Sequence, residues 1–196
     1  MWYVVQTQAA REQQICDKII EAAAAKEVPV VAAPAAGSLG GSPVPVPAPA
    51  APLLDEAFVP RYRTGRKVDG VWQPMDAVLF PGYLIVVTRR ANDLAELVRK
   101  IPEFSRMIGQ NDNVFVPLSD EEVAWIDAFT QRGHRVIGKS TAVREGDRVT
   151  VIDGPLLHRE GWIRKVNDRK KIAYLELEMF GTKVQAQVGI DVLRKR

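Results

Sequence analysis

The stretch Pro81-Gly82-Tyr83-Leu84-Ile85-Val86-Val87-Thr88 is the most strand-like part of this 196-residue chain. A Pro-Gly pair bends the chain just before it, and the residues that follow are mainly aromatic, aliphatic or β-branched. Successive side chains of a strand point to opposite faces, so Tyr83 and Ile85 share one face while Leu84 and Val86 share the other. One face can therefore pack on helices while the other is exposed or covered by a partner.

The surrounding residues predict one α+β unit over residues 1–130. Isoleucines on one face predict a helix after the first strand, and Asp69-Gly70 is a typical hairpin turn. Asn92 or Asp93 can cap a second helix, and a capping pattern at Ser119 starts a third. We therefore expect an antiparallel sheet with helices on one face. The predicted strands are residues 2–7, 58–63, 71–80, 83–88 and 114–117, and the predicted helices are residues 12–26, 93–101 and 119–129.

Residues 144–196 predict a second, smaller unit. Within it, Leu175 and Leu177 alternate with Glu176 and Glu178, as expected for a half-buried strand. Short, evenly spaced antiparallel strands of this kind are typical of a small β-barrel. The predicted strands are residues 148–152, 162–166, 172–179 and 183–188, and residues 131–143 are predicted to be a linker between the units.

Residues 29–52 differ from the rest in composition. They are rich in proline, alanine and glycine, which supply few side chains to a core, and repeated prolines prevent helices and sheet ladders. We expect a disordered or polyproline-like loop, inserted in the first unit and dispensable for folding. The alternative is a docking segment for a proline-binding module.

Charge is distributed unevenly along the chain. Residues 139–196 carry 13 Lys and Arg against 8 Asp and Glu, a net charge of +5, whereas residues 1–138 carry 14 against 16, a net charge of −2. A basic unit on a near-neutral body indicates a polyanionic partner. The sequence contains no run of 18 apolar residues and no secretion signal, so we expect a cytoplasmic protein that does not cross a membrane. The single cysteine, Cys16, is expected to be a packed small hydrophobe.

Several short motifs, taken in their order along the chain, resemble the NusG family of transcription elongation factors. In the first unit they are Trp2-Tyr3-Val4-Val5-Gln6, Phe58-Val59-Pro60, Phe80-Pro81-Gly82-Tyr83 and Pro117-Leu118-Ser119-Asp120-Glu121-Glu122-Val123. In the second unit, Glu145-Gly146-Asp147-Arg148-Val149, Asp153-Gly154-Pro155-Leu156 and Glu160-Gly161 resemble a KOW motif. The resemblance excludes residues 28–56 and implies a NusG-type N-terminal domain followed by a KOW β-barrel.

Within that family, the hairpin around Val71-Trp72 resembles the specialised paralogues, most closely the LoaP-type antiterminators. This resemblance implies a monomer that binds RNA polymerase and suppresses pausing or termination at particular operons. In the family an apolar patch docks on the polymerase clamp helices, and the matching positions here are Phe80, Tyr83 and Ile85. The alternative is that these three side chains are ordinary core residues.

Basic residues gather around two turns of the predicted barrel. Such side chains neutralise phosphates and release counterions, while Trp162 and Tyr174 could stack on unpaired bases. The LoaP likeness implies that the ligand is a nascent RNA hairpin, whereas the residues alone also fit a solvated barrel rim. The candidates for RNA binding are Arg164, Lys165, Arg169, Lys170, Lys171 and Lys183.

Two other functions fit parts of the sequence. The first is a general elongation factor, whose KOW domain binds a termination factor or a ribosomal protein. The second is a ribosome-associated RNA-binding protein, which leaves the N-terminal motifs unexplained. The sequence has no pattern typical of a catalytic site, a phosphate-binding loop or a metal site with three or four ligands. We therefore expect a binding protein, not an enzyme, that needs no metal or cofactor.

Overall fold

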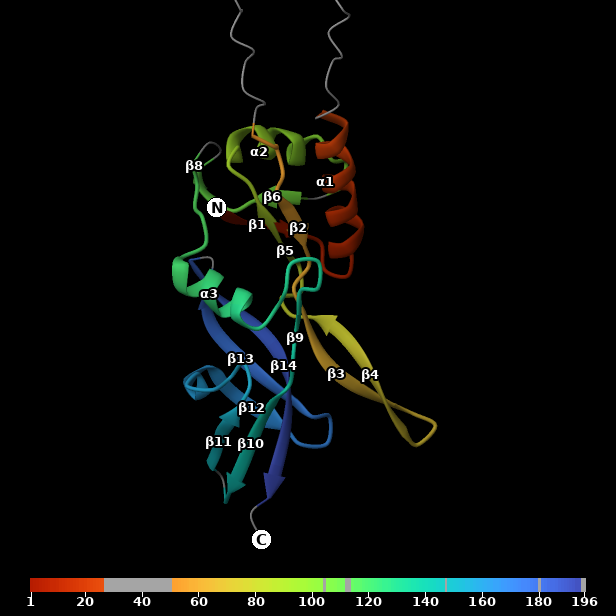
Figure 1. The fold of residues 1–196 in the computed structure, drawn as a ribbon, viewed down its shortest axis with the longest axis vertical. Helices are drawn as coiled ribbons and strands as arrows, with labels where there is room; N and C mark the ends of the chain where they lie inside the picture. Colours follow the sequence, from red (N-terminus) through yellow and green to blue (C-terminus); the bar gives the residue numbers. More distant parts are fainter. Residues whose placement is uncertain (27–50, 104, 112–113, 147, 180, 195–196) are drawn as a thin grey trace, which may run out of the picture.

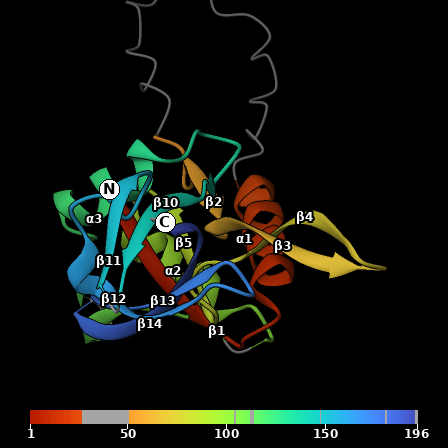
Figure 2. The ribbon, with the colours of Figure 1, turned by 90° about the horizontal axis from the view of Figure 1, so that it is seen from below.

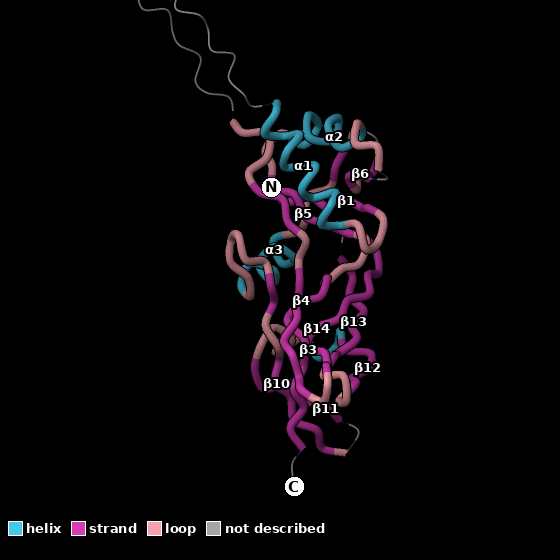
Figure 3. Tube along the Cα trace, turned by 90° about the vertical axis from the view of Figure 1, so that its right-hand side faces the viewer, coloured by secondary structure: helices cyan, strands magenta, loops and turns pink. Residues whose placement is uncertain are grey.

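The computed structural model of the chain describes residues 1–26, 51–103, 105–111, 114–146, 148–179 and 181–194. The proline-rich segment expected at residues 29–52 lies outside these ranges except for its last two residues. The described chain forms two units along the long axis of the molecule, and Figure 3 shows α1 and α2 at the end opposite the strand-rich C-terminal unit. This arrangement confirms the α+β class, and the curled C-terminal sheet fits the small β-barrel predicted for residues 144–196.

A four-stranded antiparallel sheet, in the order β2-β5-β1-β6, forms the centre of the N-terminal unit. Since β5 lies between β1 and β2, both of its edges are paired, and its side chains can point only to the two faces of the sheet. Helices α1 and α2 cover one face (Figure 1), while buried residues of α3 join the apolar cluster on the other. The elements are β1 (Trp2–Thr7), α1 (Glu12–Lys26), β2 (Glu56–Phe58), β5 (Tyr83–Val87), α2 (Ala91–Arg99), β6 (Ser105–Met107) and α3 (Asp120–Ala128).

One of the two N-caps predicted from the sequence is found in the structure. Ser119 caps α3 as predicted, because its hydroxyl accepts from the Glu122 amide and the Glu122 carboxylate accepts from the Ser119 amide. The prediction that Asn92 or Asp93 caps α2 is wrong, since the N-cap residue is Arg90. Asp93 lies in the first turn and pairs with the Arg90 guanidinium at 2.7 Å.

A long hairpin extends from the N-terminal unit beside the C-terminal sheet (Figure 2). Its strands β3 (Arg61–Val68) and β4 (Val71–Val78) are joined by Asp69 and Gly70, whose φ angles of 49° and 85° fit the expected two-residue turn. The strand predicted at residues 58–63 is thus divided between β2 and β3. A second, short hairpin pairs β7 (Gly109–Asn111) with β8 (Val114–Phe115).

The C-terminal sheet has five strands in the order β11-β10-β14-β13-β12. Leu175 and Leu177 of β13 are buried while Glu178 is exposed, which confirms the predicted alternation. Four of the strands match the predicted ones, although β14 continues further than expected and pairs in parallel with β10. The strands are β10 (Ser140–Glu145), β11 (Arg148–Asp153), β12 (Ile163–Asn167), β13 (Ile172–Met179) and β14 (Thr182–Arg194), with a 3-10 turn, η1 (Glu160–Trp162), before β12.

The segment predicted as a linker, residues 131–143, contains regular structure. Strand β9 (Val136–Ile137) pairs in parallel with β3, and β10 starts at Ser140. The path between the two units is therefore bound to the N-terminal hairpin before it enters the C-terminal sheet.

Candidate functional site

The turn before β5 fixes the position of Tyr83. Gly82 has a φ of +84°, a conformation that side chains other than glycine rarely adopt, and its carbonyl accepts from the Thr7 amide at 2.8 Å. The buried carboxylate of Glu12 accepts from the Gly82 amide at 2.7 Å. Helix α1 and strand β1 thereby hold the Pro81-Gly82 turn from one side, and Tyr83 starts β5 on a fixed backbone.

The two faces of β5 belong to different apolar clusters. Leu84 and Val86 pack in the cluster that contains the buried residues of α1 and α2. Phe80 and Ile85 are fully buried in the other cluster, and Tyr83 is half-buried against it. This second cluster continues through α3 into β13 and β14, so residues of both units form one core. The predicted separation of the faces is confirmed, and the face with Tyr83 is covered in this arrangement.

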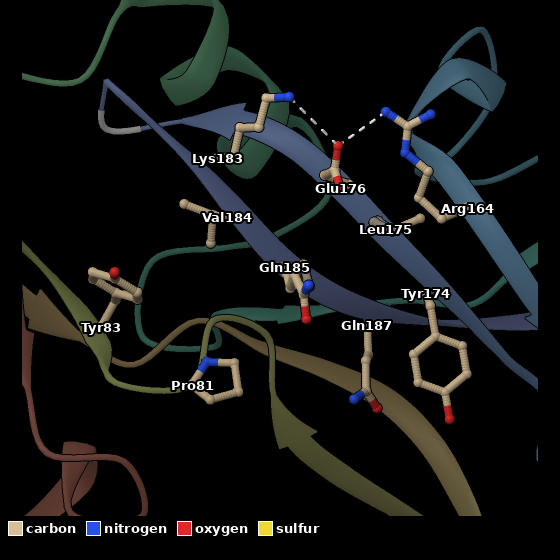
Figure 4. A pocket seen from close by; sticks show the side chains of 11 residues that line it. Pro81, Tyr83, Arg164, Tyr174, Leu175, Glu176, Lys183, Val184, Gln185 and Gln187 are labelled. Atoms are coloured by element: carbon tan, nitrogen blue, oxygen red, sulfur yellow. Dashed lines mark hydrogen bonds and ion pairs between the residues drawn. The ribbon is translucent and has the colours of Figure 1, made fainter.

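A hollow of about 460 Å³ lies between this face and the C-terminal sheet. Pro81 and Tyr83 line it from the N-terminal unit, opposite Val184 and Gln185 of β14 (Figure 4). Packing between the units is therefore incomplete beside Tyr83, whereas Leu84 and Val86 on the other face are fully buried.

Specific polar contacts join the two units around the apolar cluster. The indole Nε1 of Trp125, on α3, donates to the Pro155 carbonyl at 2.9 Å, and the Trp125 ring meets Trp162 edge-on at 5.3 Å. The Tyr62 hydroxyl on β3 donates to Gln187 Oε1 on β14 at 3.1 Å. Trp162, predicted as a base-stacking residue, thus takes part in the contact between the units.

One backbone approach shows how closely the units pack. A Cβ atom added at Gly189 of β14 would lie 2.2 Å from the carbonyl oxygen of Arg63 on β3. No larger residue fits at Gly189 while the units are packed in this way. Gly189 has no left-handed backbone conformation, but the added Cβ would also lie 2.8 Å from Cγ of Lys139, next to β10.

Arg135 ties the segment between the units to the N-terminal sheet. Its guanidinium pairs with Glu56 and with Asp127, each at 2.7 Å, and lies over the rings of Trp2 and Phe58. Hydrogen bonds to Glu56 are the main cause that raises the pKa of Arg135 above its ordinary value, with Asp127 adding to the effect. The side chain is buried but fully compensated, so the charge stays on the arginine.

The predicted RNA-binding residues separate into groups. Arg164 and Lys183 both approach the carboxylate of Glu176, at 3.0 and 4.0 Å, beside the hollow that Tyr83 lines (Figure 4). Lys171 pairs with Asp191 at 2.8 Å, and this hydrogen bond is the main cause that lowers the pKa of Asp191 below its ordinary value. These three basic side chains are therefore partly neutralised within the protein.

Two other predicted residues, Arg169 and Lys170, lie on the turn between β12 and β13. They line a separate hollow together with Trp72 and Arg66 of the β3–β4 hairpin. Lys165 is exposed on β12 and lines neither hollow. The structure thus places the six candidates at three locations rather than on one continuous rim.

Sequence reasoning did not identify three residues that organise these surfaces. Trp125 and Arg135 contact partners far away in the chain, and their type alone does not reveal those partners. Trp72 is exposed on the β3–β4 hairpin, and an aromatic residue next to the Asp69-Gly70 turn was the available signal for a binding surface. Within the described residues, no group of three His, Cys, Asp or Glu side chains could hold a metal ion, and no helix is long and apolar enough to cross a membrane.

Comparisons with known proteins indicate the family and the fold. Residues 1–127 match the family model described as NusG, transcription termination factor nusG. The transcription termination/antitermination protein NusG of Streptococcus pyogenes serotype M1 is 27% identical over 134 residues, which are 67% of this chain and 73% of the relative. The protein of that name from Escherichia coli K12 is 27% identical over 146 residues, 73% of this chain and 79% of the relative. The solved structure described as "Domain interaction in Thermotoga maritima NusG" resembles the fold with a TM-score of 0.52 and 16% identity, over 96% of this chain and 92% of that one.

Proposed function

The chain belongs to the NusG family, and from this premise we propose that it binds elongating RNA polymerase and suppresses pausing or termination. The relatives are named transcription termination/antitermination proteins, and these names support a role in the control of transcription termination. The mechanism we propose is binding, with no chemical turnover.

The observation that carries the proposal is the face of β5 that bears Tyr83. This face is apolar, it lies opposite the helix-covered face, and its cover comes partly from a separate unit of the same chain. An apolar surface that can be uncovered by moving a unit is a suitable docking site for a larger partner. We assign polymerase contact to Tyr83, Phe80 and Ile85, with Tyr83 as the most accessible of the three in the packed arrangement.

Polymerase binding at this face requires the C-terminal unit to move away. Phe80 and Ile85 have no exposed surface while the units share one core. The polymerase and the C-terminal unit therefore compete for the same surface, and the apparent affinity for polymerase is reduced by the fraction of molecules in which the units are packed. Contacts that hold the units together act as inhibitors of polymerase binding under this proposal.

For the C-terminal unit, we propose recognition of nascent RNA by the basic residues of β12 and its turn. The net charge of residues 139–196 and the exposure of Lys165, Arg169 and Lys170 support this role. RNA recognition would make the protein an operon-specific antiterminator of the LoaP type. The alternative is a general elongation factor whose C-terminal unit binds proteins, which the likeness to NusG of two bacteria favours.

Two experiments test the proposal. Purified core RNA polymerase should retain the protein in a pull-down, and Tyr83→Ala should reduce the retained amount while Tyr83→Phe keeps most of it. Polymerase that does not retain the wild-type protein would refute the proposal. Mapping the protein along the genome then separates the alternatives, since occupancy of a few operons supports the specialised role and occupancy of most genes supports the general one.

A further inference from the structure

A second hollow, of about 800 Å³, lies between the β3–β4 hairpin of the N-terminal unit and the β12–β13 turn of the C-terminal unit. Figure 2 shows the hairpin extending past the edge of the C-terminal sheet. The residues that line this hollow include Thr64, Arg66, Trp72, Met75, Arg169 and Lys170.

The hairpin offers an exposed aromatic platform. Trp72 and Met75 keep 41% and 44% of their surface exposed, which is high for large apolar residues at the wall of a hollow. The Trp72 ring packs against the strand at Gly65, because a Cβ added at Gly65 would lie 2.9 Å from the ring atom Cε3. The ring is thus held in place by the backbone, and the Lys171 ammonium lies 5.8 Å from its centre.

The charges around the hollow have one sign. Arg66, Arg169 and Lys170 line it, and none of the described lining residues is an Asp or Glu. None of these three side chains forms an ion pair with another described residue, in contrast to Arg164 and Lys183, which share Glu176 in the first hollow. The second hollow is therefore complementary to a polyanion.

A buried hydroxyl in the wall lacks a partner. Thr64 is 4% exposed, and its Oγ1 makes no hydrogen bond within the described part of the chain. Buried hydroxyl groups are normally hydrogen-bonded, and leaving one unpaired destabilises the protein. A ligand that enters the hollow and offers a hydroxyl or a base edge would satisfy this group.

We propose that this hollow binds an unpaired segment of RNA. One base stacks on Trp72, the phosphates lie against Arg169 and Lys170, and the Thr64 hydroxyl bonds to the ribose 2′-hydroxyl. The inference rests on the RNA recognition proposed above and deepens it, since it names the form of RNA and adds the hairpin of the N-terminal unit to the site. Because the walls come from both units, the complete site exists only in the packed arrangement and is lost when the C-terminal unit moves away.

The test is fluorescence anisotropy of the full-length protein with a labelled eight-nucleotide oligouridine RNA. Trp72→Ala should weaken binding roughly fivefold to a hundredfold, as expected for the loss of one stacked base. Lys170→Ala, at an exposed position with little risk to folding, should weaken binding and reduce the slope of log affinity against log salt by about one. Val71→Ala is the matched control, since it lies at the exposed hairpin tip but does not line the hollow.

Two altered ligands separate stacking from charge. An abasic oligonucleotide, which keeps the phosphates but has no bases, should bind the wild-type protein as weakly as the RNA binds Trp72→Ala. The DNA oligonucleotide of the same length should bind more weakly than the RNA, and equal affinity for the two would contradict the assignment to RNA.

The outcomes distinguish this inference from the proposed function. A wild-type protein that binds no RNA at low salt overturns RNA recognition as a whole, and with it this site. If the wild-type protein binds RNA, Trp72→Ala is unchanged and Lys165→Ala weakens binding, then the ligand lies on the outer face of β12 and the hollow is not the site. Loss in Trp72→Ala with no change in Val71→Ala supports the inference.

Discussion

The two faces of β5 carry similar apolar side chains but have different partners. Leu84 and Val86 meet α1 and α2, which belong to the same unit and are joined to the sheet by short connections or by direct packing. Ile85 and the half-buried Tyr83 join a cluster that extends into a second unit, with a hollow and several specific polar contacts along the way. Both faces are buried, so burial alone does not distinguish them. The difference lies in the residues that cover each face, which belong to the same unit for Leu84 and Val86 and partly to the second unit for Ile85 and Tyr83.

The largest effect is expected from the helix-covered face. Leu84→Ala should lower the free energy of unfolding by about 2–5 kcal/mol, because it leaves a cavity among fully buried residues. Urea unfolding monitored by circular dichroism measures this loss. If the free energy of unfolding falls by less than about 1 kcal/mol, the residues around Leu84 can repack into the cavity. The helix-covered face would then not be a rigid core, which contradicts the proposed difference between the two faces.

A smaller effect is expected from Gly189→Ala, which acts on the contact between the units. The added methyl group would meet the Arg63 carbonyl, and overpacking of this kind costs roughly 1–3 kcal/mol. We expect the units to separate in a larger fraction of molecules, which small-angle X-ray scattering would show as an increased radius of gyration. The far-ultraviolet circular dichroism spectrum should stay unchanged, and a lost strand signal would show that Gly189 serves the C-terminal sheet itself.

The smallest expected effect is on the labelling rate of Cys16. This residue packs in the same cluster as Leu84 and Val86, so its reactivity reports on the helix-covered face. Burial raises the pKa of its thiol to about 12, so at pH 8 the group remains protonated and unreactive in the folded protein. Labelling by a thiol reagent should be slow in the wild type and equally slow in Gly189→Ala, since separating the units leaves α1 in place. Leu84→Ala should accelerate it, and acceleration in Gly189→Ala instead would show that the two faces open together.

Local patterns were sufficient for much of the fold. The alternation along β5, the hairpin turn at Asp69-Gly70 and the capping box at Ser119 depend on neighbouring residues, and the structure confirms all three. Each of these features is specified by the local backbone and by the period of the side chains. The boundaries of β13 follow in the same way from its alternation.

Non-local pairing explains what the sequence did not reveal. Strand β9 has two residues and exists because it pairs with β3, and β10 forms parallel to the distant β14. Arg135 meets Glu56, 79 positions earlier in the chain, so a basic residue in an apparent linker became a buried ion pair. The separation of the basic residues into different locations likewise depends on how the units pack, which no local pattern specifies.

The affinity of RNA polymerase for the full-length protein and two variants tests the central claim most directly. Tyr83→Ala should weaken binding by at least about 1 kcal/mol, roughly fivefold, because it removes an aromatic contact. Gly189→Ala should strengthen binding, roughly tenfold for each 1.4 kcal/mol by which the packed arrangement is destabilised, because more molecules present the Tyr83 face. Opposite shifts in the two variants are the predicted result. Unchanged or weakened binding by Gly189→Ala, in a protein whose units have separated, would contradict the claim that polymerase and the C-terminal unit compete for this face.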